Sequence, residues 1–375
     1  IMSYESIDKL QKLLADTVFD YTSDKKKAAG RALGTFLEII TYYLIKAWQL
    51  DICTAIEKPL SEFANIEITH NVEFTLHGSQ IIASDTFTEN DIPITGRRLL
   101  QQHNIHTNRQ QKSTILIDKN HVIRNACTLF CDDITMLNAY IDSMHNIYSI
   151  FQLQKHPFAM FECKRVGVES GMKKGPQTIE KAKQGSYVAR TVSALQRVRK
   201  IDGRMAGILQ RSENDFLIED YYELLNRVIY SNDMHLLKNF ILTIGVVSNH
   251  GNWFTSDNPN KELKVLSQSY DWLIFLTDKG LSEFITDLLL SEDDEYKAVK
   301  KAFTLSYSKN KTTNIFTKVK MDYASDKAIG HYFKKNIKKI ENWFNIISPK
   351  EKTLSDLKEQ LFILSRKNWQ EVYSK

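Results

Sequence analysis

The 375-residue chain is poor in the residues that mark several protein classes. Its four cysteines all lie in apolar segments, which argues against a disulfide framework and predicts buried thiols in a reducing cytoplasm. Six Pro and fourteen Gly against sixteen Tyr and nineteen Phe argue for a compact, ordered chain. No apolar run reaches the roughly 18 residues that span a bilayer. The N-terminal region also lacks the residue order of a secretory signal, so we expect a cytoplasmic protein that contacts no membrane.

Positive charge is concentrated in one segment. The whole chain has a net charge of only +5, but residues 155–211 contain thirteen Lys and Arg against four Asp and Glu. That segment therefore has a balance of +9, and the remainder of the chain sums to −4. A basic segment on a nearly neutral body is typical of a protein that binds a polyanion, although a solvated helical face has the same composition.

The order of apolar patterns predicts an α/β fold. Helical spacing covers 4–19 and 28–50 at the start, 329–347 and 354–373 at the end, and continues from Pro176 to about Arg199 in the middle. Residues 66–94 partly alternate and carry a turn signal at His77-Gly78, which favours hairpin strands. Short strands are expected over 114–117, 126–130 and 134–137, and buried strands over 158–166, 239–248 and 271–277, while 137–151 fits either structure.

Residues 158–166 (FAMFECKRV) are the most informative stretch. Side chains alternate across a strand, so Glu162 and Lys164 should share one face. The apolar residues before them indicate a central strand, where a lone charge is costly to bury. A carboxylate and an ammonium group placed together in this way suit a divalent-metal site.

Asp133-Ile-Thr-Met-Leu137, followed by Phe161-Glu-Cys-Lys164, resembles the signature of the PD-(D/E)XK nuclease superfamily. The preceding helix, which carries Glu38 beside its apolar stripe, is similar to one in the type II restriction endonuclease branch. The resemblance spans roughly residues 28–290. It implies a mixed-sheet core at 61–290, with N-terminal helices at 1–60 packed on that core and a C-terminal helical region at 291–375.

The upstream acid of this signature has several candidates because Cys131-Asp132-Asp133 lacks the usual proline. Asp133 precedes a strand-like segment and is favoured. Asp132 would point to the opposite face of that strand. Asp142 is closer to Glu162 along the chain but lies in the segment that also fits a helix.

The resemblance implies Mg²⁺ chemistry at these residues. Mg²⁺ binds carboxylate and water oxygens, usually through one or two protein carboxylates beside a substrate phosphate. Asp133 and Glu162 would hold the ion, which lowers the pKa of a bound water and stabilises phosphoryl charge. Lys164 would orient that water or help to deprotonate it. Glu38 would act through a water or a second metal ion.

A glycine-rich loop and a basic helix follow the Glu-x-Lys strand. We expect Lys173, Lys174, Lys181, Gln184 and Arg190 to contact the DNA backbone, since phosphate contacts position a duplex. The loop lacks the Gly-Lys-Ser/Thr of a nucleotide-binding P-loop, so no nucleotide cofactor is expected. Asn249-His250 suggests a different nuclease type, but its companion residues are missing.

Three functional hypotheses follow. The first is a Mg²⁺-dependent, sequence-specific type II restriction endonuclease that cuts double-stranded DNA as a homodimer, as the resemblance implies. The second is a repair or recombination nuclease of the same superfamily, which acts on ends or structures. The third is a DNA-binding protein in which Glu162 and Lys164 form only a structural ion pair.

Overall fold

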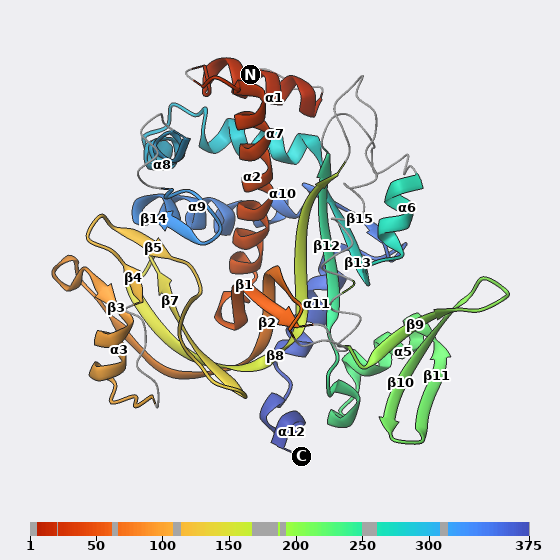
Figure 1. Ribbon diagram of the computed structural model, residues 1–375. Coiled ribbons are helices and arrows are strands. Elements are labelled where there is room, and N and C mark those ends of the chain that lie inside the picture. The colour runs from red at the N-terminus through yellow and green to blue at the C-terminus, as the bar shows by residue number, and fades with distance from the viewer. Residues whose placement is uncertain are drawn as a thin grey trace.

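An eight-stranded mixed sheet flanked by helices forms the centre of the protein in the computed structural model (Figure 1). The structure describes residues 6–20, 22–61, 67–107, 114–166, 187, 193–249, 261–307 and 314–374. The mixed α/β class expected from the sequence is confirmed at this level. Within these ranges, no helix is both long enough and apolar enough to cross a lipid bilayer.

The strand order of the large sheet is β1-β2-β8-β12-β13-β15, and β6 and β7 join it along β8. β12 is parallel to β8 and β13, whereas the other neighbours are antiparallel. The strands are β1 (Thr54–Ser61), β2 (Thr69–Thr86), β6 (Cys127–Cys131), β7 (Thr135–Asp142), β8 (Ile147–Val166), β12 (Leu242–Asn249), β13 (Trp272–Leu276) and β15 (Phe344–Ser348).

Strand β8 is twenty residues long and serves two parts of this sheet. Its first half, residues 147–154, pairs with β7, and its second half, residues 159–166, pairs with β12. β2 pairs along both halves, with register shifts around His77 opposite Pro157. Pro157 has no backbone N–H to donate, so the regular hydrogen-bond pattern of the two strands is interrupted there. The second half of β8 is therefore a central strand with neighbours on both sides, as its apolar sequence predicts.

Helix α2 (Lys25–Ala47) covers one face of the sheet (Figure 1). The Asp24 carboxylate caps its N-terminus by accepting a hydrogen bond from the Lys27 N–H. The apolar stripe of α2 packs with Phe161 and Cys163 of β8 in one hydrophobic cluster. Alternate β8 residues face the opposite side, where Met160 packs with α6 (Lys261–Ser267). The two-residue alternation of β8 thus separates two layers of core.

The remaining elements surround this sheet. One small sheet contains β9 (Leu195–Arg199), β10 (Met205–Ser212) and β11 (Asp215–Asp220), and another contains β3 (Ile94–Thr95), β4 (Ile115–Ile117), β5 (Val122–Arg124) and β14 (Lys320–Asp322). The other α-helices are α1 (Ile7–Thr17), α3 (Gly96–Gln102), α5 (Tyr221–Tyr230), α7 (Asp278–Leu288), α8 (Lys297–Tyr307), α9 (Tyr323–Lys335), α10 (Ile337–Glu341), α11 (Leu354–Ser365) and α12 (Trp369–Ser374). Short 3₁₀ turns are η1 (Asp51–Cys53), η2 (Glu89–Asp91), η3 (Met234–Leu237) and η4 (Asp294–Tyr296).

The turn expected at His77-Gly78 does not exist, because both residues lie inside the long strand β2. Gly78 serves a close approach instead. A Cβ atom there would lie 2.3 Å from the Cβ of Trp369, which packs against the strand from α12. Glycine inside a strand can mark such a contact as well as a turn.

Three other local predictions also need correction. The helix expected to continue to Arg199 is replaced at its end by strand β9. The helix expected over 329–347 stops at Glu341 and is followed by β15. Cys131 is exposed, although the other three cysteines are buried as expected, and all four are free thiols.

The predicted segment boundaries cross continuous structure. The boundary at residue 60 falls within β1, and β15 of the expected C-terminal helical region pairs with β13 of the large sheet. A single hydrophobic cluster includes residues from Ile7 to Val372. The N- and C-terminal helices therefore contribute to the same core as the sheet.

Candidate active site

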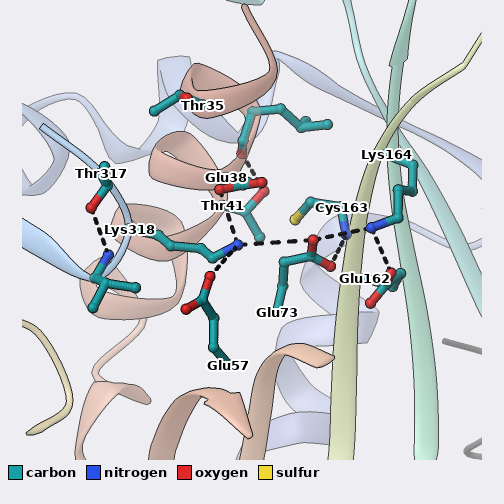
Figure 2. A network of polar contacts seen from close by, with 12 residues as sticks. Thr35, Glu38, Thr41, Glu57, Glu73, Glu162, Cys163, Lys164, Thr317 and Lys318 are labelled. Atoms are coloured by element: carbon teal, nitrogen blue, oxygen red, sulfur yellow. Dashed lines mark hydrogen bonds and ion pairs between the residues drawn. The ribbon is translucent and has the colours of Figure 1, made fainter. Parts of the chain in front are cut away.

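Six charged side chains gather near the C-terminal half of β8 (Figure 2). They come from five places in the chain and meet where α2 crosses the sheet. The group, called here the Glu–Lys cluster, consists of Glu38 (α2), Glu57 (β1), Glu73 (β2), Glu162 and Lys164 (β8), and Lys318 just before β14. Four carboxylates and two ammonium groups leave a formal charge of −2 when all six are ionised.

Glu162 and Lys164 share one face of β8, as the alternation rule predicts. The Lys164 Nζ lies 2.7 Å from the Glu162 Oε1. It also donates to the Glu73 Oε1 at 3.1 Å, so one ammonium links two carboxylates. Glu162 and Glu73 are 5% and 8% exposed, respectively, whereas the Lys164 side chain is 32% exposed. The lysine therefore connects a buried acid pair with the surface.

Glu73 reaches this position because of how β2 and β8 pair. Their paired register runs up to Phe74 opposite Phe161, and Glu73 is the next residue of β2. The Cys163 N–H donates to the Glu73 Oε2 at 3.1 Å. A side chain thus satisfies a β8 amide, and this bond fixes the Glu73 carboxylate beside Glu162.

Lys318 anchors the other side of the cluster. Its Nζ lies 3.0 Å from the Glu38 Oε2, 3.3 Å from the Glu57 Oε1 and 3.9 Å from the Glu73 Oε1. The backbone bend that carries it is held in place because the Asn125 Nδ2 donates to the Lys318 carbonyl at 3.2 Å. Glu73 therefore lies between the two lysines (Figure 2).

The pKa values of the two buried acids, Glu162 and Glu73, are shifted in opposite directions. Burial raises the pKa of Glu162 to about 8, and the nearby negative charge of Glu73 adds to this effect against the opposing charge of Lys164. Burial also acts to raise the pKa of Glu73, but a hydrogen bond from Glu162 and the charges of Lys164 and Lys318 outweigh it and lower that pKa. Without a metal ion, a proton on Glu162 allows two carboxylates to be buried together.

The two lysines remain cationic. Burial lowers the pKa of Lys164, but the carboxylates of Glu162 and Glu73 raise it by more, so the net shift is upward. Burial likewise lowers the pKa of Lys318, but the negative charges of Glu38 and Glu73 outweigh it, so this pKa is also raised. Both groups are therefore ammonium ions at neutral pH, and Lys164 is a donor of hydrogen bonds rather than a base. Burial also raises the pKa of Glu38 despite the charge of Lys318.

One carboxylate oxygen in the cluster accepts no hydrogen bond from the described residues. The Glu162 Oε2 is buried and accepts no hydrogen bond from any residue that the structure describes. A buried carboxylate oxygen normally has a donor or a cation beside it. This atom, next to the Glu73 carboxylate, therefore has room in its bonding for a cation, and a hard ion such as Mg²⁺ suits two carboxylates.

Asp133, the favoured upstream acid, is not brought to Glu162. It lies in the exposed turn between β6 and β7, and its Oδ1 is 3.9 Å from the Nζ of Lys155. Lys155 precedes Glu162 by seven residues on β8, which corresponds to about 23 Å of strand. Glu73 therefore takes the place that the sequence analysis gave to Asp133.

The other two candidates are also elsewhere. The Asp132 Oδ1 accepts from the Thr135 N–H and holds the same turn. Asp142 ends β7 opposite Ile147, and its Oδ2 contacts the His145 Nδ1 at 2.6 Å. Both therefore have local structural roles. Glu38, by contrast, does belong to the cluster through Lys318.

A cleft of about 660 Å³ opens beside the cluster. Lys164 and Glu38 form part of its wall, whereas Glu73 and Glu162 lie behind Lys164 and do not line it. Basic residues outnumber acidic ones in its lining, which comprises Gln11, Asp24, Lys26, Lys27, Gly30, Arg31, Gly34, Leu37, Glu38, Cys163, Lys164 and Arg165. The five residues predicted to contact DNA, namely Lys173, Lys174, Lys181, Gln184 and Arg190, lie outside the described residues, as does His250.

Sequence analysis missed three members of the cluster. Glu73 had a usable signal, because it is an acid between the apolar residues Val72 and Phe74 of a strand. Glu57 has a backbone φ of 52°, which no sequence pattern indicates. Lys318 lies outside any periodic segment, and nothing in the sequence links it to β8.

Comparisons with protein-family models, with curated proteins and with solved structures find no match for this chain. Across the described ranges, no three His, Cys, Asp or Glu side chains are gathered closely enough to hold a metal ion by themselves. The chemistry of the site therefore has to be argued from the Glu–Lys cluster, with two carboxylates as the protein's share of any metal coordination.

Proposed function

We propose that this protein is a Mg²⁺-dependent nuclease that hydrolyses phosphodiester bonds of double-stranded DNA. The observation that carries the proposal is the buried Glu162 Oε2, which accepts no hydrogen bond from the described residues, in a carboxyl group beside a second carboxylate and an ammonium group. Without metal, a proton shared with Glu73 compensates this carboxyl group. A divalent cation would replace that proton.

Glu73 and Glu162 are the residues that would hold the ion. Two carboxylates match the usual protein contribution to a Mg²⁺ site, where water and substrate phosphate supply the remaining ligands. When bound, Mg²⁺ supplies charge stabilisation on the phosphoryl oxygens and lowers the pKa of a coordinated water. The proton on Glu162 must leave before the ion binds. A proton and a metal ion would therefore compete for this buried carboxylate.

Lys164 would act on the attacking water and on the phosphate. Its ammonium is held by Glu162 and Glu73, and about a third of the side chain is exposed toward the cleft. Because its raised pKa keeps it protonated, it would orient the water and stabilise negative charge in the transition state. The alternative that Lys164 deprotonates the water is disfavoured by the same pKa.

The cleft supports a polyanionic substrate. Lys26, Lys27 and Arg31 line it from α2, and Arg165 lines it from β8. Cationic side chains along a groove neutralise backbone phosphates and release counterions, which makes affinity fall as salt increases. The basic wall next to two carboxylates therefore suits a phosphodiester backbone rather than a neutral substrate.

Sequence-specific cleavage by a homodimer is the finer part of the proposal. It rests on the resemblance of Phe161-Glu-Cys-Lys164 and the Glu38 helix to the restriction-endonuclease branch of the PD-(D/E)XK superfamily. A symmetric dimer matches a palindromic target, with one strand cut by each subunit. Light scattering of the purified protein measures the oligomeric state directly.

The decisive experiment incubates the purified protein with phage DNA, with and without Mg²⁺. We expect cleavage only with the metal, and a rate at least about 10²-fold lower for Glu73→Gln, because a ligand and a transition-state contact are lost together. Asp133→Asn is the matched control and should stay within about twofold of the unmodified protein, since seven residues of strand separate its contact from Glu162.

The fragments separate the remaining hypotheses. Discrete bands with one shared end sequence support a restriction endonuclease, whereas progressive loss from ends supports a repair or recombination nuclease. Absence of cleavage with every divalent ion tested, together with retained DNA binding, would leave the non-catalytic DNA-binding protein.

A further inference from the structure

Lys318 has no assigned role in the chemistry described so far, yet it is among the most buried lysines of the described chain. Its side chain is 9% exposed and lies among three carboxylates, at 3.0 Å from Glu38, 3.3 Å from Glu57 and 3.9 Å from Glu73 (Figure 2). An ammonium has three N–H donors, so one lysine can serve three acceptors. This arrangement places a permanent positive charge within the acid cluster.

The charge balance of the cluster shows what that ammonium does. With both lysines present, the four carboxylates leave a formal charge of −2, which a single divalent ion neutralises. Without Lys318 the charge would be −3, and Glu38 and Glu57 would lose the ammonium group with which each forms an ion pair. Two metal ions are the common way to neutralise such a set of acids at a phosphoryl-transfer site.

We propose that Lys318 is a built-in cation that takes the place of a second metal ion, so that the site binds one divalent ion, at Glu73 and Glu162. This inference rests on the proposed function. Under this proposal Glu38 and Glu57 pair with the lysine and do not bind a metal ion. Of the two roles that the sequence left open for Glu38, binding of a second metal ion is therefore rejected.

The fold around Lys318 supports a fixed charge rather than a chance contact. Thr317 holds the bend, because its Oγ1 accepts from the Lys320 N–H at 3.0 Å and from the Val319 N–H at 3.2 Å. Glu57 adopts φ 52° in strand β1, a left-handed conformation that is rare and costly for a residue with a side chain. The backbone is thus constrained on both sides of the ion pair.

Glu73 connects the two halves of the cluster. Its Oε1 lies 3.1 Å from the Lys164 Nζ and 3.9 Å from the Lys318 Nζ. Lys318 is therefore placed to hold the Glu73 carboxylate in position beside Glu162. Lys318 is a positioning residue in this scheme, because it acts through Glu73 and not on the substrate.

Counting bound Mn²⁺ by electron paramagnetic resonance tests the inference without any cleavage assay. We expect one ion per chain for the unmodified protein and two for Lys318→Met, which removes the charge but keeps the length of the side chain. Lys318→Arg retains the charge and should bind one ion. Lys320→Met, at an exposed lysine two residues away, is the matched control and should also bind one.

The outcomes distinguish this inference from the proposed function. Two ions in the unmodified protein, or one ion in folded Lys318→Met, would overturn the role of Lys318 and leave the nuclease proposal standing. If the unmodified protein binds no ion but Lys318→Met binds one, the proposed metal site at Glu162 would be wrong. The role of Lys318 as a built-in cation would then still stand. No ion in either protein would overturn both.

Glu57→Gln provides a second test if Lys318→Met does not fold. Glu57 is half exposed, so its replacement is tolerated more easily than a change at buried Lys318. Under our proposal Glu57 does not touch the metal, and the Mn²⁺ dissociation constant should change by less than about threefold. Loss of a metal ligand or of its direct support typically costs 10- to 100-fold in affinity, and a change of that size would overturn the proposal.

Discussion

Glu162 and Asp326 are both buried acids paired with a lysine, but only Asp326 accepts hydrogen bonds from described residues at both of its oxygens. Asp326 is 1% exposed, and each of its oxygens contacts the Lys46 Nζ at 3.0 Å. The Tyr43 and Ser143 hydroxyls donate to the same carboxylate. Glu162 contacts Lys164 through Oε1, whereas its Oε2 has no partner among the described residues.

This difference separates a structural ion pair from a site that can bind something. A satisfied pair such as Lys46–Asp326 gains from every donor, so removing one partner leaves an uncompensated charge. A buried acid with a raised pKa and an oxygen that accepts no hydrogen bond contributes little to the stability of the fold. Under the proposed function, this arrangement is kept for a cation that binds at Glu162.

The largest expected effect follows from replacing Glu162 with Gln. The variant keeps the shape of the side chain and removes the negative charge that would bind the metal. We expect cleavage of phage DNA to fall by at least about 10³-fold while the melting temperature stays the same or rises. Initial cleavage rates and thermal unfolding measure the two effects. A melting temperature that falls steeply would make Glu162 a structural residue and end the contrast.

The reverse result is expected for Asp326→Asn. This change removes the carboxylate that forms the ion pair with the buried Lys46 ammonium, so the free energy of unfolding should fall by about 3–5 kcal/mol. Denaturant titration measures that loss. Cleavage per folded molecule should be nearly unchanged, because the partners of Asp326 are Tyr43, Lys46 and Ser143, which lie outside the Glu–Lys cluster. Equal stability of the variant and the unmodified protein would contradict this reading.

The smallest effect is on the pH dependence of stability. The pKa of Glu162 is raised to about 8 in the folded protein from an ordinary value near 4.5. The folded state therefore keeps a proton that the unfolded state has lost, and stability should decrease as pH rises from about 5 to 8 without metal. Glu162→Gln should flatten that decrease. Melting temperatures across this range test it, and an identical slope in both proteins would count against the shifted pKa.

The sequence was informative wherever neighbours in the chain decide the structure. The apolar run before Glu162 predicted a central strand, and two-residue alternation placed Glu162 and Lys164 together. The stripe on 28–50 predicted α2, although the helix begins three residues earlier and ends three residues sooner than expected. These features depend on local propensity and burial pattern, which a single sequence carries.

The choice of Asp133 failed because pairing across the sheet is not local. The strand just before β8 in sequence is β7, but β7 pairs only with the first half of β8. The second half of β8 pairs instead with β12 and with β2, far upstream, and β2 brings Glu73 beside Glu162. No periodic signal gives this partner choice, and the same holds for Lys318.

The late position of Lys318 in the chain has a consequence for how the protein is made. Glu38, Glu57, Glu73 and Glu162 all leave the ribosome well before Lys318 is added. A nascent chain at that stage holds its carboxylates without the ammonium that three of them share. Assembly of the complete charge cluster therefore has to wait until residue 318 has left the ribosome, so a nascent chain shorter than this has an incomplete Glu–Lys cluster.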